Sequence, residues 1–255
     1  LTKTTGHQVI HYTYDALDRL LSCTEIGKHK SVYAYDAFNR HTETSEYLDV
    51  NGQWQEQKRL CHLFQNNEEV GTLDKSQKTL MDFKTLRPGK NKKAVIIEIQ
   101  GKAYTPIYDH TNSIAALIES DSTEAVVESY RYSAFGEEQI FNQNADPIQK
   151  SRVENCWRYA NKRTDTQTGL VDFGLRWYLP SIGQWLTRDP AGFVDGPNLY
   201  CYNHCNPLKY YDPYGLSAKE KEKTPGVHNR NKSIFSEARD TVKDFFQGMA
   251  SLFSE

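Results

Sequence analysis

The sequence predicts a mainly β protein built from strand-turn-strand repeats, with a short helix near its C-terminal end. Three observations carry this prediction. A segment containing Tyr and Asp recurs at a fixed offset. Short β-prone segments separated by turn residues fill the chain up to residue 216, and apolar residues follow a sustained helical spacing only after residue 232.

The repeat is the clearest of these signals. Residues 12–20 read YTYDALDRL and residues 33–41 read YAYDAFNRH, so Tyr, Asp, Ala and Arg recur 21 positions apart. In each copy, alternating Tyr-x-Tyr places two rings on one face of a strand, and the following Asp marks a tight turn into a returning strand. A degenerate third copy, YRYSAFG at 130–136, carries Ser133 in place of the Asp. Such a period is typical of stacked supersecondary units.

Further strands are expected between the copies. The apolar segment 95–99 precedes a Gln-Gly turn, and residues 113–118 and 125–130 flank a polar loop, which predicts a hairpin. Residues 84–93, KTLRPGKNKK, hold five basic residues around Pro-Gly. We expect a solvated loop there rather than a contact with nucleic acid.

The composition changes after Leu216. Residues 217–232 are charged and rich in turn residues, which predicts a flexible linker. Residues 233–253 place apolar side chains at helical spacing and predict a short amphipathic helix, with Ser233 or Ser236 as its N-cap. We expect this helix to pack on a partner or on further sequence, because two basic residues are too few for a membrane surface.

The composition also narrows the class of protein. A net charge of −2 gives no long-range attraction to nucleic acid, and no run of about 18 apolar residues could span a membrane. The first residues, LTKTTGHQVIHYTYD, lack the charged and apolar regions of a signal peptide. Because the chain starts with Leu, we expect it to be the C-terminal part of a longer protein.

The five Cys residues are scattered, which leaves room for one bridge but predicts no disulfide framework. The cluster Cys201-Tyr-Asn-His204-Cys205 lacks a second ligand pair at zinc spacing. We therefore expect packing residues there, and neither a metal nor a cofactor.

Several segments resemble the RHS/YD-repeat proteins, and in particular their RHS repeat-associated core. The copies YDALDRL and YDAFNR are similar to the YD repeat. Residues 108–118, YDHTNSIAALI, resemble the family's Asp-His-x-Gly-Ser-Val segment, with Asn112 where Gly is usual, and YRYSAFGE resembles its Tyr-x-Tyr-Asp-x-Phe-Gly-Glu segment. The most specific match covers residues 155–216, where TGL, LRWY, IGQWLTRDP, NLYCY, NPL and DPYGL follow the family's order and spacing.

The resemblance implies a β-spiral shell whose YD repeats form a hollow wall and whose associated core closes one end. It divides the chain into a shell segment over 1–150, a core over 151–216 and a variable C-terminal effector region over 217–255. In toxin members of the family, the core cleaves the chain after Asp-Pro-x-Gly-Leu and frees an effector inside the shell. The implied partners are the chain's own tail as cargo, and either missing N-terminal shell sequence or a second shell protein. The implied location is outside the cell or at its surface, reached from the cytoplasm by a specialised export route.

The family's self-cleavage is attributed to an Arg and two Asp, which the motifs carry onto Arg176, Asp189 and Asp212. Cleavage would fall between Leu216 and Ser217 and would make the chain a single-turnover, aspartic-type autoprotease. Two close carboxylates cannot both ionise cheaply, so one can polarise the carbonyl while the other takes a proton from water. The Asp-Pro-Tyr-Gly turn would fold the scissile carbonyl back toward the carboxylates.

Other interpretations of these residues stay open. Asp189 and Asp212 each precede Pro and could be turn residues, and the stem of Arg176 could pack on aromatic rings. The hydroxyl of Ser217 could attack the carbonyl of Leu216, although no His or Cys adjoins it. The chain could also be a non-catalytic structural or surface-interaction protein, as in the teneurins that use a similar shell, or a truncated remnant of one.

Overall fold

The computed structural model describes residues 2–5, 8–65, 67–87, 93–120 and 125–221, and strands dominate this part of the chain. Fourteen strands form one antiparallel sheet in which each strand pairs with its neighbours in sequence. These strands are β1 (Thr2–Thr5), β2 (Gln8–Tyr14), β3 (Leu20–Glu25), β4 (His29–Tyr35), β5 (His41–Val50), β6 (Gln53–Gln65), β7 (Glu68–Asp74), β8 (Thr79–Leu86), β9 (Ala94–Ile99), β10 (Lys102–Tyr108), β11 (Ile114–Glu119), β12 (Val126–Tyr132), β13 (Glu138–Asn142) and β14 (Pro147–Ile148). The predicted mainly β fold is confirmed.

Two smaller sheets follow the large one. The first contains β15 (Arg163–Thr164), β16 (Val171–Asp172), β17 (Trp177–Leu179) and β18 (Gln184–Trp185), and the second pairs β19 (Tyr210–Tyr211) with β20 (Lys219–Glu220). The described helices are 3-10 helices of three residues: η1 (Tyr159–Asn161), η2 (Pro180–Ile182), η3 (Phe193–Asp195) and η4 (Asn203–Cys205). Within the described ranges, no helix has the length and apolar character that a membrane span requires.

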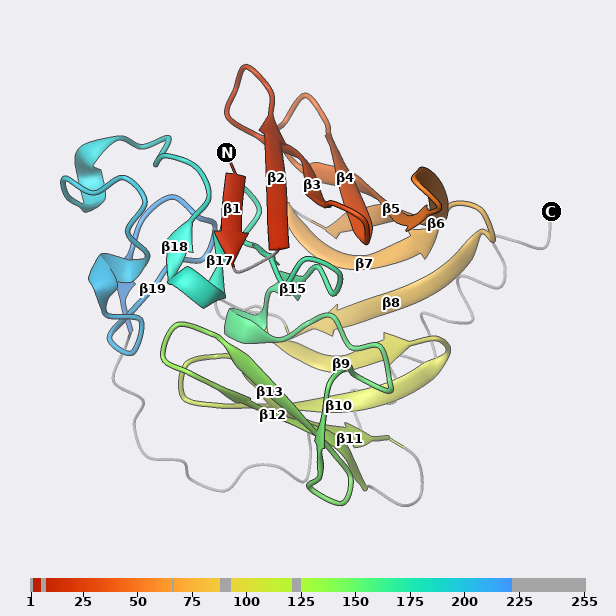
Figure 1. Cartoon of the computed structure of the whole chain (residues 1–255). Coiled ribbons are helices and arrows are strands. Elements are labelled where there is room, and N and C mark those ends of the chain that lie inside the picture. Colours follow the sequence, from red (N-terminus) through yellow and green to blue (C-terminus); the bar gives the residue numbers. More distant parts are fainter. Residues whose placement is uncertain (1, 6–7, 66, 88–92, 121–124, 222–255) are drawn as a thin grey trace.

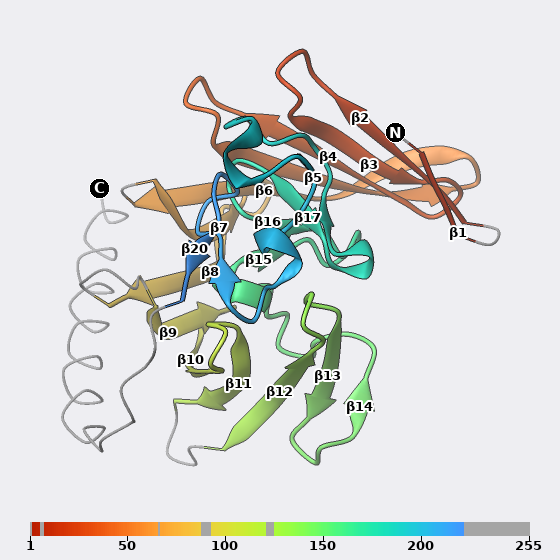
Figure 2. The same cartoon turned by 90° about the vertical axis from the view of Figure 1, so that its left-hand side faces the viewer.

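The large sheet bends until its first and last strands lie on opposite sides of the segment that carries β15 to β17 (Figure 1, Figure 2). Apolar side chains of that segment fill the space between them. At the first end, Tyr12 and Tyr33 of the repeats pack against Leu170 and Trp177, and all four are buried. At the other end, Trp157 packs in a cluster built from β9 to β13. The segment after residue 150 is therefore the core of the molecule.

Each repeat copy ends in the same five-residue turn, which the Asp holds through its side chain. In the second copy, the amide of Asp36 donates to the carbonyl of Arg40 at 3.0 Å. The Asp36 carboxylate accepts from the amides of Phe38 and Arg40 at 2.9 Å each and pairs with the Arg40 guanidinium at 2.7 Å. Asn39 has a φ of 65°, a left-handed conformation that Asn tolerates. The copy around Asp15 makes the same set of contacts.

The same turn recurs at two segments that lack the full Tyr-x-Tyr-Asp pattern. Residues 133–137 close it with a bond of 2.8 Å and place Gly136 at a φ of 92°, which confirms the degenerate third copy. Residues 109–113 close it at 2.9 Å, with Asn112 at a φ of 73°. Asn at this position keeps the turn that Gly would make, because both residues adopt the left-handed conformation at little cost.

The predicted strands between the copies are also present, as β9 and as the antiparallel β11–β12 pair, whose loop tip lies outside the described residues. The expectation of a solvated basic loop over 84–93 was wrong for its first three residues, which belong to β8. Lys84 belongs to β8 and is buried, with its ammonium 3.3 Å from the centroid of the Trp157 ring. The aromatic face compensates part of the desolvation of the ammonium, and burial lowers the pKa of Lys84 to about 7.

The segment assigned to a linker begins as ordered structure. Lys219 and Glu220 form β20 and pair with Tyr211 and Tyr210, so the chain turns back on itself across Leu216 and Ser217. The predicted helix at 233–253 lies outside the described residues.

We expect Asp36→Ala to lower the free energy of unfolding by about 1–2 kcal/mol, because two backbone amides and the Arg40 guanidinium lose their acceptor. Ser133→Ala is the matched control, since the Ser133 hydroxyl accepts one amide bond, from Glu137. It should cost about 0.5 kcal/mol. Urea unfolding followed by tryptophan fluorescence measures both, and equal losses would contradict the assigned role of Asp36.

Candidate functional site

The structure brings together the three residues that the motifs select. One terminal nitrogen of the Arg176 guanidinium, Nη1, lies 2.9 Å from Oδ2 of Asp189, and the other, Nη2, lies 3.4 Å from Oδ2 of Asp212. The Nη1 contact is an ion pair whose direction is poor for a hydrogen bond. Arg176 thus bridges two carboxylates that lie 23 residues apart in the sequence (212 − 189).

Short elements of the core position the three side chains. Arg176 directly precedes β17, Asp189 follows β18, and Asp212 follows β19. The amide of Leu175 donates to the carbonyl of Tyr214 at 3.2 Å and joins the last loop to the start of β17. The pairing of β17 with β18 brings the ends of these strands together, so tertiary structure assembles the site.

The three charged side chains are almost fully removed from water, with exposed fractions of 1% for Arg176, 5% for Asp189 and 2% for Asp212. Burial lowers the pKa of Arg176, and it raises the pKa of Asp212 despite the amides and the guanidinium that favour the charged carboxylate. A buried carboxyl with a raised pKa holds its proton more readily than one in water. This environment therefore favours proton exchange at Asp212.

The Asp-Pro-Tyr-Gly segment forms a tight turn around Asp212. Oδ1 of Asp212 accepts from the amides of Tyr214 at 3.1 Å and Gly215 at 2.8 Å. Gly215 has a φ of 75°, and a Cβ there would lie 3.1 Å from the Arg176 amide nitrogen. Only glycine fits this position without strain, which accounts for the Gly of the motif.

Two side chains hold the backbone on either side of the Leu216–Ser217 bond. Nε of Arg176 donates to the carbonyl of Gly215 at 2.5 Å, and the amide of Ala218 donates to Oδ2 of Asp195 at 2.7 Å. Asp195 lies in η3 and belongs to none of the motifs that predicted the candidate site. Its signal was weak, because an Asp before Gly reads as an ordinary turn residue.

The surroundings of Arg176 combine an aromatic floor with an adjoining cavity. The guanidinium carbon lies 4.2 Å from the centroid of the buried Trp185 ring. A cavity of about 380 Å³ borders Arg176 and Asp189 and is also lined by Arg19 of the first repeat turn and by Arg188. The residues that line this space do not include those of the Asp-Pro-Tyr-Gly turn.

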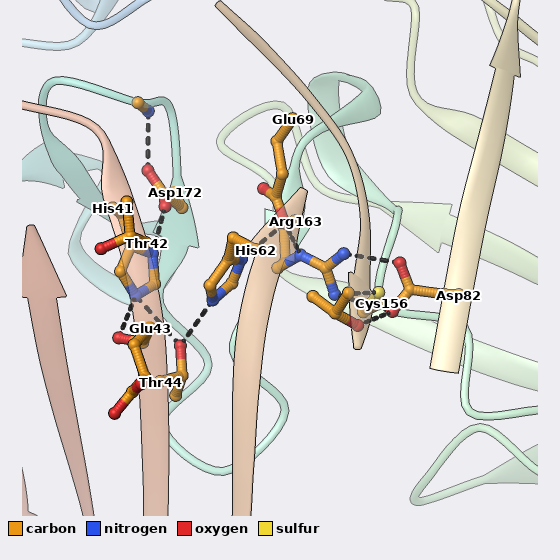
Figure 3. Close-up of polar contacts among 12 residues, drawn as sticks. His41, Thr42, Glu43, Thr44, His62, Glu69, Asp82, Cys156, Arg163 and Asp172 are labelled. Carbon is orange, nitrogen blue, oxygen red and sulfur yellow. Dashed lines mark hydrogen bonds and ion pairs between the residues drawn. The ribbon is translucent and has the colours of Figure 1, made fainter. Parts of the chain in front are cut away.

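A second set of buried polar residues joins the core to the large sheet (Figure 3). Nδ1 of His41 contacts Asp172 at 2.8 Å, and the hydroxyl of Thr44 lies within 3.0 Å of both His41 and His62. Nδ1 of His62 contacts Glu69 at 2.7 Å. Burial and the neighbouring His41 lower the pKa of His62.

Arg163 of β15 ends this chain of contacts. Nε of its guanidinium donates to Glu69. The two terminal nitrogens, Nη2 and Nη1, donate to Oδ1 and Oδ2 of Asp82 at 2.6 Å and 3.2 Å. Burial alone would lower the pKa of Arg163, but Asp82, Cys156 and Glu69 raise it well above its ordinary value. The network satisfies polar groups that the core would otherwise bury without partners.

Comparison with known proteins identifies relatives that are named as nucleases and toxins. The chain is 29% identical over 210 residues, 80% of its length, to the tRNA nuclease WapA of Bacillus subtilis. It is 35% identical over 113 residues, 43% of its length, to toxin subunit YenC2 of Yersinia entomophaga. It is 27% identical over 234 residues, 85% of its length, to double-stranded DNA deaminase toxin A of Burkholderia cenocepacia. The chain spans only 8%, 11% and 16% of these proteins' own lengths. No family model matches the chain.

The fold is similar to solved toxin-complex structures. A crystal structure of TcdB2-TccC3-Cdc42 matches 81% of this chain and 10% of that chain, with a TM-score of 0.61 and 21% identity. A Photorhabdus luminescens Tc holotoxin pore matches 89% of this chain and 10% of that chain, with a TM-score of 0.59 and 20% identity. These likenesses concern the fold alone. The similarity to toxin proteins that the motifs predict is confirmed over most of the chain.

We expect Arg163→Met to lower the free energy of unfolding by about 3–5 kcal/mol, because Glu69 and Asp82 would keep buried charges without their cation. The matched control is Arg188→Met, which removes an ion pair with Asp18 whose two side chains are 63% and 58% exposed. That change should cost less than about 1 kcal/mol. Thermal unfolding monitored by circular dichroism compares the two, and a loss for Arg163→Met no larger than the control's would refute the role of the network.

Proposed function

We propose that this chain is the C-terminal part of an RHS-type toxin shell whose associated core cuts the chain after Leu216 and releases the tail. The observation that carries this proposal is the convergence of Arg176, Asp189 and Asp212 at the turn before that bond. The similarity to proteins named as toxins supports the family side of the proposal.

The two carboxylates have environments suited to different roles. Asp212, whose pKa is raised by burial, is the candidate acid that polarises the Leu216 carbonyl. Asp189 faces a guanidinium nitrogen at 2.9 Å and is the candidate base that takes a proton from water. Attack of that water on the carbonyl carbon forms a tetrahedral intermediate. Its collapse breaks the bond to Ser217 as a carboxyl group of the pair delivers a proton to the leaving nitrogen. The products are a Leu216 carboxylate and a Ser217 amine, and no external cofactor enters the step.

The contacts on either side of the bond support an intramolecular reaction. Arg176 holds the Gly215 carbonyl, and Asp195 holds the Ala218 amide. The β19–β20 pair closes the same loop. Fixing a substrate bond beside its catalytic groups replaces the entropy cost of binding with folding that has already occurred.

The proposal extends to the partners of the chain. β1 and β14 are the outer strands of the large sheet within the described residues, and each leaves an edge that further shell strands can extend. The missing shell would come from N-terminal sequence or from a second protein, and the cargo would be residues 217–255. As a toxin component, the assembly would act outside the producing cell after specialised export.

The alternative function is a structural one, and the burial of Arg176 favours it. A guanidinium at 1% exposure between two carboxylates and over Trp185 also serves as a clamp between loops. A non-catalytic surface or scaffold protein would keep this clamp and leave the bond intact.

We expect the wild-type chain to divide after Leu216, and Asp189→Asn and Asp212→Asn to slow this cleavage by at least about a hundredfold, because each removes an acid–base group. Asp74→Asn is the control, since Asp74 is equally buried but caps a turn of the sheet. Ser217→Ala should still cleave. Denaturing gels and intact mass follow the release of the 39 residues from 217 to 255.

Several outcomes separate the proposed functions. Cleavage by both Asp variants together with loss of cleavage in Ser217→Ala would replace the carboxylate mechanism with hydroxyl attack. An uncut wild-type chain with native far-UV circular dichroism would favour the structural clamp.

A further inference from the structure

We propose that Cys201 and Cys205 form a reversible disulfide that closes the η4 loop. Their sulfur atoms lie 2.9 Å apart, and both are free thiols in the structure. The remaining three cysteines are Cys23 and Cys156, which are buried, and Cys61, which is partly exposed. Cys201 and Cys205 are thus the two thiols that the 2.9 Å distance pairs. This proposal does not depend on the proposed function.

The backbone of the loop is bent in a way that brings the two thiols together. Asn203, His204 and Cys205 have φ values of 49°, 51° and 57°. Single non-glycine residues visit the left-handed region, but runs of them are unfavourable and have to be held by their surroundings. Here the Cys205 amide donates to the Tyr202 carbonyl at 2.9 Å, and the ring of Tyr202 is buried in the core. The loop thus maintains a strained conformation that presents both thiols on one side.

The two thiols differ in exposure, and this difference decides which of them reacts first with an oxidant. Cys205 is exposed, whereas Cys201 is only partly exposed. The backbone of Cys201 also forms an isolated antiparallel β-bridge with Gln184. Burial and the neighbouring Cys205 raise the pKa of Cys201 to about 11. The exposed Cys205 is therefore the thiol that an oxidant reaches first.

The oxidant is a small disulfide of the glutathione class. The Cys205 thiolate attacks its sulfur–sulfur bond, expels one glutathione thiolate and forms a mixed disulfide. The Cys201 thiolate then attacks the Cys205 sulfur and expels the second glutathione. The protein loses two protons and two electrons, and the oxidant becomes two thiols. A reducing cytoplasm would keep the pair open, and an oxidising exterior would close it.

Closure would brace the connection between the two carboxylates of the candidate site. The loop lies between Asp189 and Asp212 in the sequence, and Nδ2 of Asn203 donates to the carbonyl of Tyr210 in β19 at 3.1 Å. Fixing the loop would therefore fix the strand that leads into Asp212.

The test equilibrates the full chain with glutathione at a series of reduced-to-oxidised ratios, followed by acid quenching, alkylation and peptide mapping. In the oxidised samples we expect the peptide with both residues to lose two hydrogens, and alkylation of Cys201 and Cys205 to fall at least about tenfold, with recovery on reduction. Cys201→Ser should instead leave Cys205 carrying one glutathione. Serine is nearly isosteric with cysteine, and if this variant fails to fold, the wild-type map alone decides.

Three outcomes would overturn the proposal. They are a glutathione adduct on Cys205 that persists in the wild-type chain, a disulfide between two copies of the chain, and full alkylation of both thiols at every ratio. Because none of these readouts involves the Leu216–Ser217 bond, the result is independent of whether the chain cleaves itself.

Discussion

The structure depends on one buried cation, Arg163, and on the carboxylates that neutralise it. Its guanidinium joins the segment after residue 150 to the large sheet, because Glu69 comes from β7 and Asp82 from β8. A buried charge is tolerated only when its partners are in place. The core segment therefore has to keep one position relative to the strands that carry Glu69 and Asp82. Through Glu69 the same constraint reaches His62, His41 and finally Asp172 of the neighbouring core strand.

The candidate site follows from this placement. Asp172 leads through a short turn to Arg176, whose guanidinium then selects its own two carboxylates from the next loops. The core therefore uses the same arrangement twice: an arginine beside an aromatic ring and bound to two acidic side chains. The guanidinium carbon lies 4.2 Å from the centroid of Trp157 for Arg163 and 4.2 Å from that of Trp185 for Arg176. In the first case both acids belong to the sheet, and the result is attachment of the core. In the Arg176 arrangement both acids belong to the core and lie beside a turn, and the result is the candidate functional site.

The local structure was accessible from the sequence because its signals are local. Tyr-x-Tyr followed by Asp predicted the strands and turns correctly, since the Asp side chain, its own turn amides and the nearby Arg lie within five residues. The turn at 109–113 and the burial of Lys84 were harder to predict from the sequence. The first depends on a backbone conformation that Asn and Gly share, and the second on a Trp157 ring located 73 residues later (157 − 84). The motifs selected Arg176, Asp189 and Asp212, but missed Asp195, which acts on the backbone through tertiary contact.

By itself, the sequence determined the fold class, the repeated turn and the identity of three candidate residues, because periodicity and turn chemistry are written in neighbouring positions. Only the tertiary structure decided that one guanidinium lies between both carboxylates, that Gly215 packs too closely on Arg176 for any side chain, and that β20 turns back beyond Ser217. These facts depend on how the large sheet bends around the core. That bend goes with the burial of aromatic rings and with the pairing of Arg163 of the core with carboxylates from distant strands of the sheet. A linear pattern does not encode contacts between residues so far apart in the sequence.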